Sequence, residues 1–140
     1  MTLLRHLREA LTRPSRIAVL AVTPWPEDRE CLRQVASRTG WEVLSAASSE
    51  EALAILKKRP IPVILCDRDL PGIGWRDTLA KFLEPAAARC VVLISAVNDE
   101  YLLREVVHLG GYDVILKPLQ EDRVVSAIQL AWNFWYLGRN

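Results

Sequence analysis

Apolar runs and helical patterns alternate five times along the chain. Strand candidates cover Ile17–Val22, Trp41–Ala46, Ile61–Cys66, Cys90–Ser95 and Tyr112–Leu116. The first, third and fourth runs are apolar almost throughout, which is typical of parallel strands that are covered on both faces. Apolar residues recur with helical spacing in the segments Glu27–Thr39, Ser49–Lys58, Trp75–Leu83, Asp99–Leu109 and Glu121–Trp135. This alternation with short links predicts βαβ crossovers and an α/β protein with a parallel sheet.

Both ends of the chain extend beyond this core. Leucines at helical spacing in the first turns predict an amphipathic helix, and Pro14 ends it before the first strand. We therefore expect residues 1–15 to form a helix and linker, and residues 16–140 to form one domain. At the other end, an inward stripe of the last helix reaches the aromatic tail. An amphipathic face outside a complete core needs an apolar partner, so we expect a homodimer. The interaction residues predicted are Leu3, Leu7, Leu11, Trp132, Trp135 and Tyr136.

Composition is that of a globular protein of one domain. Of 140 residues, 51% are hydrophobic and 25% charged, and the formal net charge is +1. With this near-zero net charge, the protein has no overall positive potential that would attract nucleic acid. No apolar stretch approaches the ~20 residues that span a bilayer. We expect neither a direct nucleic-acid partner nor a membrane partner. Three widely spaced cysteines without a Cys-x-x-Cys motif argue against a zinc site or disulfides and favour a cytoplasmic location.

Three polar residues stand at the ends of three predicted strands. Asp67 follows the third apolar run, and Leu-Pro-Gly comes three residues later. Ser95 closes the fourth run. Lys117 follows the fifth run and precedes a proline. Because carboxyl ends of parallel strands share one edge of a sheet, a carboxylate, a hydroxyl and an ammonium are expected at that edge, with Asp67 and Lys117 as an ion pair.

This spacing resembles the receiver domain of two-component response regulators, over roughly Arg16 to Trp132. The resemblance implies a flavodoxin-like (βα)5 doubly wound sheet of strand order 2-1-3-4-5 with an extra N-terminal helix. It implies that Asp67 accepts phosphate and that Ser95 and Lys117 bind the phosphoryl group. A histidine kinase or phosphotransfer protein would be the donor, and the chain would be a signalling module and not an enzyme.

The first predicted strand ends in Thr23 and Pro24, where the resemblance would place a magnesium-binding acidic pair. Thr23 has a neutral hydroxyl, and Pro24 has no side-chain oxygen. Since Mg²⁺ is usually held by one or two carboxylates, we expect its binding to be weak. Asp67 and Asp69 are the candidate metal ligands, although a solvated or helix-capping role is the favoured interpretation of Asp69.

Two further possibilities remain open at this site. Glu27 or Asp28 could approach from the first loop, or Lys117 could neutralise Asp67 alone and leave a site that needs no metal. Trp25 and Trp75 stand on the loops that flank this site, and they either cover it from solvent or pack over the edge of the hydrophobic core.

The chain also lacks the aromatic residue whose side chain, in the family it resembles, switches between buried and exposed positions. The family often has one three residues before the lysine, where this chain has Val114, and Tyr112 lies two residues upstream with a predicted position on the same strand face. A valine cannot swing between buried and exposed positions with comparable effect. These departures support an alternative function, a phosphorylation-independent pseudo-receiver that acts as a dimerisation or protein-interaction module.

A nucleotide- or flavin-binding enzyme of the same fold class is disfavoured. Such sites need a loop rich in Gly, Ser or Thr after the first strand, so that backbone amides can reach phosphate. The segment Thr23–Asp28 instead holds two prolines, a tryptophan and two acids.

Overall fold

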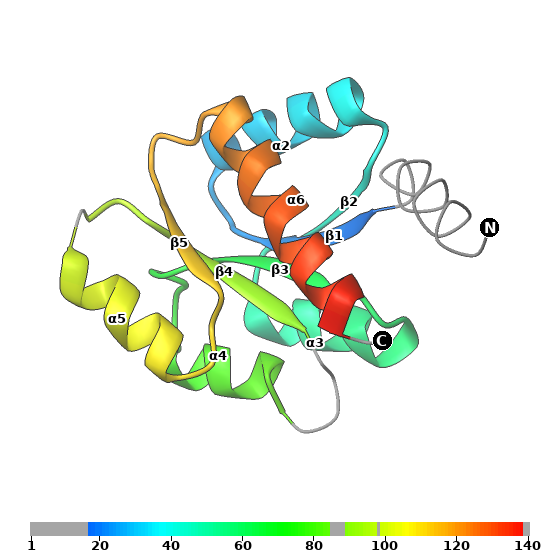
Figure 1. Ribbon diagram of the computed structural model, residues 1–140. Helices are drawn as coiled ribbons and strands as arrows, with labels where there is room; N and C mark the ends of the chain where they lie inside the picture. Colours follow the sequence, from blue (N-terminus) through cyan, green and yellow to red (C-terminus); the bar gives the residue numbers. More distant parts are fainter. Residues whose placement is uncertain (1–16, 85–88, 98, 139–140) are drawn as a thin grey trace.

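A computed structural model describes residues 17–84, 89–97 and 99–138 of the protein (Figure 1). The predicted N-terminal helix, with Leu3, Leu7 and Leu11, lies outside these residues. The sheet is parallel, with the order β2-β1-β3-β4-β5, which confirms the predicted flavodoxin-like topology. Its strands are β1 (Ala18–Val22), β2 (Glu42–Ala46), β3 (Val63–Asp67), β4 (Cys90–Ser95) and β5 (Asp113–Leu116).

The helices lie on both faces of this sheet (Figure 1). They are α2 (Pro26–Thr39), α3 (Ser49–Lys58), α4 (Trp75–Phe82), α5 (Glu100–His108) and α6 (Glu121–Gly138). The predicted limits of α3 are confirmed, and Ser48 caps this helix by accepting a hydrogen bond from the Glu51 amide. β3 begins later than predicted, at Val63, because Pro62 has no amide hydrogen for the ladder.

Each face of the sheet has its own apolar core. Val19 and Ala21 of β1 belong to the cluster that includes α2 and α6, whereas Leu20 and Val22 belong to the cluster that includes α3, α4 and α5. Consecutive residues of one strand are therefore buried on opposite faces, which explains why the central strands read as unbroken apolar runs. The three cysteines are free thiols, as predicted.

Backbone bonds align the carboxyl ends of the strands at one edge. The Arg68 amide donates to the Ile94 carbonyl, and the Lys117 amide donates to the Ser95 carbonyl, both at 2.8 Å. Val22, at the end of β1, is paired with Cys66 of β3. The residues that follow β1, β3, β4 and β5 are therefore held close to one another.

The inward stripe of α6 reaches its aromatic tail, as predicted. Trp132 is only 7% exposed and belongs to the core, and its ring stacks on Tyr136 with centroids 5.0 Å apart. Its prediction as a surface interaction residue is wrong, because the inward stripe of α6 extends to this position. Trp135 and Tyr136 are partly buried against the same core. The exposed apolar residues of α6 are Leu130, Phe134 and Leu137.

Tyr112 and Val114 do not share a face of the sheet. Tyr112 packs on the α6 side, where its ring lies 5.3 Å from that of Phe134, whereas Val114 packs on the opposite side. The prediction of a common face is wrong because Tyr112 precedes β5, which begins at Asp113, so strand alternation does not extend to it.

No helix in the described ranges has both the length and the apolar character that crossing a membrane requires.

Gly111, between α5 and β5, allows a close approach of backbone that a side chain would prevent. Its amide donates to the Val106 carbonyl at 2.8 Å, and a Cβ atom would lie 2.5 Å from Val106 Cγ1. We expect Gly111→Ala to lower the free energy of unfolding in urea by about 1–3 kcal/mol, through overpacking. Gly74→Ala is the control, because nothing lies within 4 Å of its Cβ position. Equal losses in the two variants would contradict this packing.

Candidate functional site

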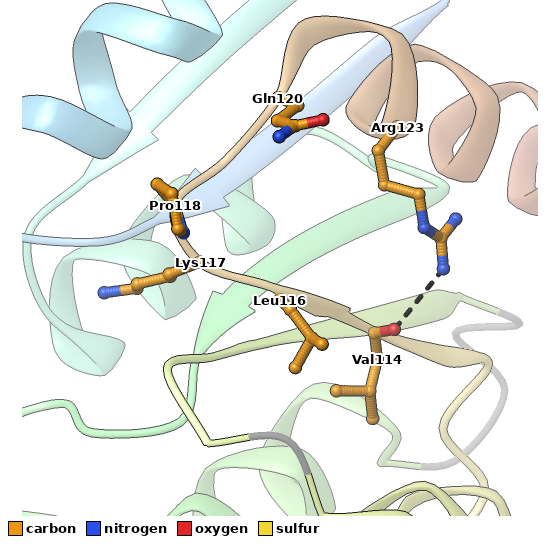
Figure 2. Close-up of a pocket in the computed structure, with 6 residues that line it drawn as sticks. All are labelled: Val114, Leu116, Lys117, Pro118, Gln120 and Arg123. Carbon is orange, nitrogen blue, oxygen red and sulfur yellow. Dashed lines mark hydrogen bonds between the residues drawn. The ribbon is translucent and has the colours of Figure 1, made fainter.

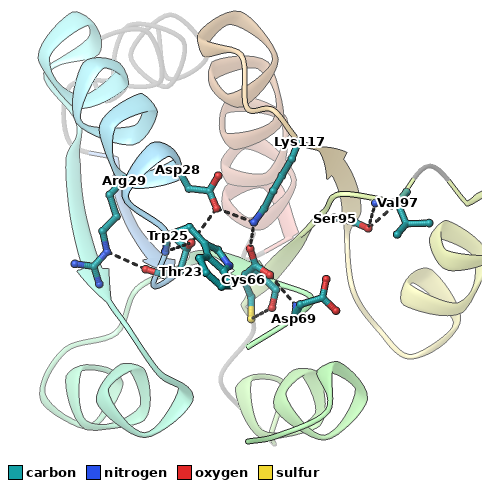
Figure 3. Close-up of polar contacts among 10 residues, drawn as sticks. Thr23, Trp25, Asp28, Arg29, Cys66, Asp69, Ser95, Val97 and Lys117 are labelled. Atoms are coloured by element: carbon teal, nitrogen blue, oxygen red, sulfur yellow. Dashed lines mark hydrogen bonds and ion pairs between the residues drawn. The ribbon is translucent and has the colours of Figure 1, made fainter. Parts of the chain in front are cut away.

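Asp67 and Lys117 form the predicted ion pair at the carboxyl edge of the sheet (Figure 3). Asp67 is the last residue of β3 and is 1% exposed. Lys117 follows β5, two strands away, and its Nζ atom contacts Asp67 Oδ2. The two oxygens of Asp67 have different surroundings. Oδ1 accepts a hydrogen bond from the Asp69 amide at 2.7 Å, whereas Oδ2 has no hydrogen-bond partner among the described residues and contacts the Lys117 ammonium as an ion pair.

Asp28 is the second carboxylate of the site. It is the third residue of α2 and is 2% exposed. Its Oδ2 atom lies 3.0 Å from Lys117 Nζ and accepts a hydrogen bond of 2.9 Å from the Thr23 hydroxyl (Figure 3). Of the two acids considered for the first loop, Asp28 reaches the site, and Glu27 is exposed. Lys117 contacts Asp67, as the alternative without a metal requires, but its ammonium also faces Asp28, so two carboxylates share it.

The loop after β1 fixes Thr23, and Thr23 orients Asp28. The Thr23 amide donates to the Ala46 carbonyl at 2.9 Å, and the Thr23 hydroxyl accepts from the Trp25 amide at 3.2 Å. Arg29 Nε donates to the Thr23 carbonyl at 2.9 Å. Pro26 begins α2, a position at which a helix needs no amide hydrogen. Thr23 and Pro24, which lack the expected carboxylates, thus belong to a loop that brings one in from a helix.

A signal for Asp28 is present in the sequence. The buried residues of α2 are Asp28, Leu32 and Val35, which follow one another at helical spacing. An acid on the apolar stripe of a helix that starts beside the switch point predicts a buried, paired carboxylate. This spacing would favour Asp28 over Glu27 as the acid that reaches the site from the first loop.

Opposing effects act on the Lys117 ammonium. Burial disfavours its charged form, but the contacts with the Asp67 and Asp28 carboxylates outweigh this effect and raise the pKa of Lys117 above its ordinary value. The ammonium is therefore charged at neutral pH. The Trp25 ring, 40% exposed, has its centroid 5.6 Å from Nζ, a cation–π distance. Trp25 thus covers the ammonium, whereas Trp75 belongs to the core.

Ser95 is not brought to the ion pair. The Ser95 hydroxyl donates a hydrogen bond to the Val97 carbonyl and accepts one from the Val97 amide, both at 3.0 Å (Figure 3). Ser95 thus makes the local bonds that serines often make at strand ends. Its role in binding a phosphoryl group stays a prediction.

The described donor groups do not fit a magnesium site. Asp69 gives its amide to Asp67, but its carboxylate is exposed and points away from Lys117 (Figure 3). Within the described ranges, no three His, Cys, Asp or Glu residues form a group that could hold a metal ion. The two buried carboxylates already face the ammonium, whereas Mg²⁺ demands near-octahedral oxygen ligands. The predicted pairing of Asp67 and Asp69 as ligands is not formed.

A separate open pocket lies beside β5, at the edge of the sheet (Figure 2). Arg123 ion-pairs with Asp113 at 3.2 Å and approaches the Val114 carbonyl at 3.5 Å. The lining residues are Val114, Leu116, Lys117, Pro118, Gln120 and Arg123. Asp67 and Asp28 do not line this pocket, so it is not the site of the ion pair.

Comparisons with known proteins agree with this geometry. The family model described as "Response regulator receiver domain" matches residues 4–129. The hydrogenase transcriptional regulatory protein HoxA of Cupriavidus necator is 31% identical over 81% of this chain and 23% of its own length. The chemotaxis protein CheY of Thermotoga maritima is 25% identical over 71% of this chain and 84% of its own length. The chain spans less than half the length of the transcriptional regulators HoxA and AruR that it matches.

Solved structures show the same fold. The chemotaxis response regulator CheY4 of Vibrio cholerae superimposes with a TM-score of 0.76 at 20% identity. The match covers 83% of this chain and 98% of that chain.

The Thr23 hydroxyl should be more important for stability than an ordinary buried hydroxyl. Thr23→Val removes the donor to Asp28 and the acceptor of the Trp25 amide, so we expect unfolding in urea to lose about 1–3 kcal/mol. Thr78→Val is the matched control, because its hydroxyl donates to the Gly74 carbonyl, which also accepts the Thr78 amide. Its expected loss is below about 1 kcal/mol. The reverse order would show that Thr23 does not orient Asp28.

Proposed function

The chain belongs to the response regulator receiver family, and from this premise we propose that Asp67 accepts a phosphoryl group from a histidine kinase or a phosphotransfer protein. The observation that supports the proposal is the buried Asp67 carboxylate, placed at the carboxyl end of β3 and paired with Lys117. An acceptor carboxylate needs a nearby cation to offset the charge of the incoming phosphoryl group, and Lys117 supplies one.

The two oxygens of Asp67 have different roles in this proposal. Oδ1 is held by the Asp69 amide, so Oδ2 is the atom that attacks phosphorus. A P–O bond to Oδ2 forms while the P–N bond of a phosphohistidine breaks, and the imidazole takes up the electron pair and a proton. The product is an acyl phosphate. Because Oδ2 loses its charge in this step, the Lys117 ammonium moves its contact to a phosphoryl oxygen.

Ser95 has a proposed role in the phosphorylated form. Rotation of its side chain would release Val97 and bring the hydroxyl toward the phosphoryl group. Its place at the end of β4, between β3 and β5, supports this assignment.

Intact mass measures acceptance of phosphate directly. After incubation with acetyl phosphate, we expect the protein to gain one phosphoryl group and Asp67→Asn to gain none. Asp69→Asn is the control and should gain it, because Asp69 contributes only a backbone amide to Asp67. We expect chelation of magnesium to change the extent of phosphorylation little.

A second function is favoured by one observation. The Lys117 ammonium is shared between Asp67 and Asp28. The negative charge of Asp67 is therefore only partly neutralised, and the described residues around it do not form a metal site. If the folded parent gains no phosphoryl group, with or without magnesium, the chain acts instead as a phosphorylation-independent interaction module.

A homodimer is the proposed partner state. Large apolar residues are exposed on the elements around the β5 edge of the sheet, which are Tyr101 and Val107 of α5, Leu116 of β5, and Leu130, Phe134 and Leu137 of α6. Burial of these side chains against a second copy would remove apolar area from water.

Light scattering at micromolar concentration should give the mass of a dimer. Tyr101→Ser combined with Phe134→Ser should shift it to that of a monomer, since both rings are exposed apolar surface. Lys57→Ser, on α3 at the β2 end of the sheet, should leave the dimer intact. A monomeric mass for the parent protein would exclude this interface.

A further inference from the structure

We propose that the ammonium of Lys117, held between Asp28 and Asp67, is the resident cation of this site in place of a divalent metal ion, and that Asp28 is the positioning residue that keeps it there. Nζ lies 3.0 Å from Asp28 Oδ2 and contacts Asp67 Oδ2. The inference deepens the proposed function and rests on it for the identity of the site. Its test, however, measures metal binding and unfolding and needs no phosphoryl transfer.

The surroundings of Nζ suit an ammonium. An ammonium has three hydrogens to donate, and two carboxylate oxygens face it from α2 and β3. On a further side lies the face of the Trp25 indole ring, which attracts a cation but offers no ligand atom to a metal. A magnesium ion at the same place would need the two carboxylate oxygens together with several waters, and the ammonium already occupies the position between those carboxylates.

Thr23 orients Asp28 and the loop after β1. Its hydroxyl donates its hydrogen to Asp28 Oδ2 and accepts the Trp25 amide. The carbonyl of Thr23 accepts from Arg29 Nε. Both oxygens of Thr23 are therefore used to hold the loop and the Asp28 carboxylate in place.

No acid follows β1, where Thr23 and Pro24 stand, and the negative charge at this place comes instead from Asp28 in the first turn of α2. Two carboxylates and one ammonium leave the cluster with a net charge of −1, provided that both acids are ionised. Removal of the ammonium would leave two buried carboxylates, Asp28 from α2 and Asp67 from β3, that face the position of Nζ. That arrangement attracts a divalent cation, so in this structure the lysine and the metal are alternatives for one position.

Lys117→Met tests this exchange in the full chain. Magnesium chloride is titrated into the parent and the variant, and binding is followed by calorimetry and by the temperature of thermal unfolding. We expect the parent to show no saturable binding at millimolar magnesium and no rise in unfolding temperature. The variant should bind magnesium at least about tenfold more tightly than the parent, and its unfolding temperature should rise with magnesium by linkage.

Three further variants make the test specific. Lys57→Met, which removes an exposed lysine of α3, should behave as the parent does. Lys117→Met combined with Asp28→Asn should lose the acquired magnesium binding, because one of the two facing carboxylates is gone. Asp28→Asn alone keeps the ammonium, so it should unfold at a lower temperature than the parent and remain insensitive to magnesium. This last variant decides the question if Lys117→Met fails to fold.

Saturable magnesium binding by the parent as tight as that of Lys117→Met would overturn the proposal. So would a folded Lys117→Met variant that binds no magnesium, or an Asp28→Asn variant whose unfolding temperature rises with magnesium. Failure of Asp67 phosphorylation would leave all of these results unaffected, so the two proposals fail separately.

Discussion

The ammonium of Lys117 lies between the buried carboxylates of Asp28 and Asp67, and the arrangement of the carboxyl edge depends on this shared charge. A buried carboxylate without a partner is costly, so each acid is tolerated only because the lysine reaches it. The sheet order places β4 between β3 and β5, and the four-carbon stem of Lys117 spans that strand. One side chain therefore joins the end of β3, the end of β5 and the first turn of α2.

Much of the fold follows from pattern, because burial on both faces of a sheet produces apolar runs that are visible in the sequence. The pairing of Asp67 with Lys117 follows in the same way, since both residues stand at strand ends. Asp28 was considered only as one of two possible acids of the first loop, and its burial on the inward stripe of α2 singles it out from the exposed Glu27. The orientation of Ser95 does not follow from its place at a strand end, because its hydroxyl is hydrogen-bonded to the backbone of Val97 and not directed at the ion pair.

The chain belongs to the receiver family, yet its described residues do not form a group that could hold a metal ion. The position of Asp67 follows from a topology that the chain shares with receiver domains of known structure. The immediate charge environment follows from the loop after β1, where Thr23 and the two prolines direct α2 so that Asp28 points inward. The fold thus keeps an aspartate at the carboxyl end of β3, while the second carboxylate of the site comes from α2 and not from the end of β1. In our account, the lysine then supplies the positive charge at the acceptor.

A crystal structure grown with millimolar manganese, recorded at the manganese absorption edge, tests this account most directly, because manganese takes the oxygen ligands that magnesium takes. The account predicts Lys117 Nζ within ion-pair distance of both Asp28 and Asp67, with no anomalous peak between the two carboxylates. A manganese peak at coordination distance from Asp67, with the lysine side chain turned out of the site, would contradict it.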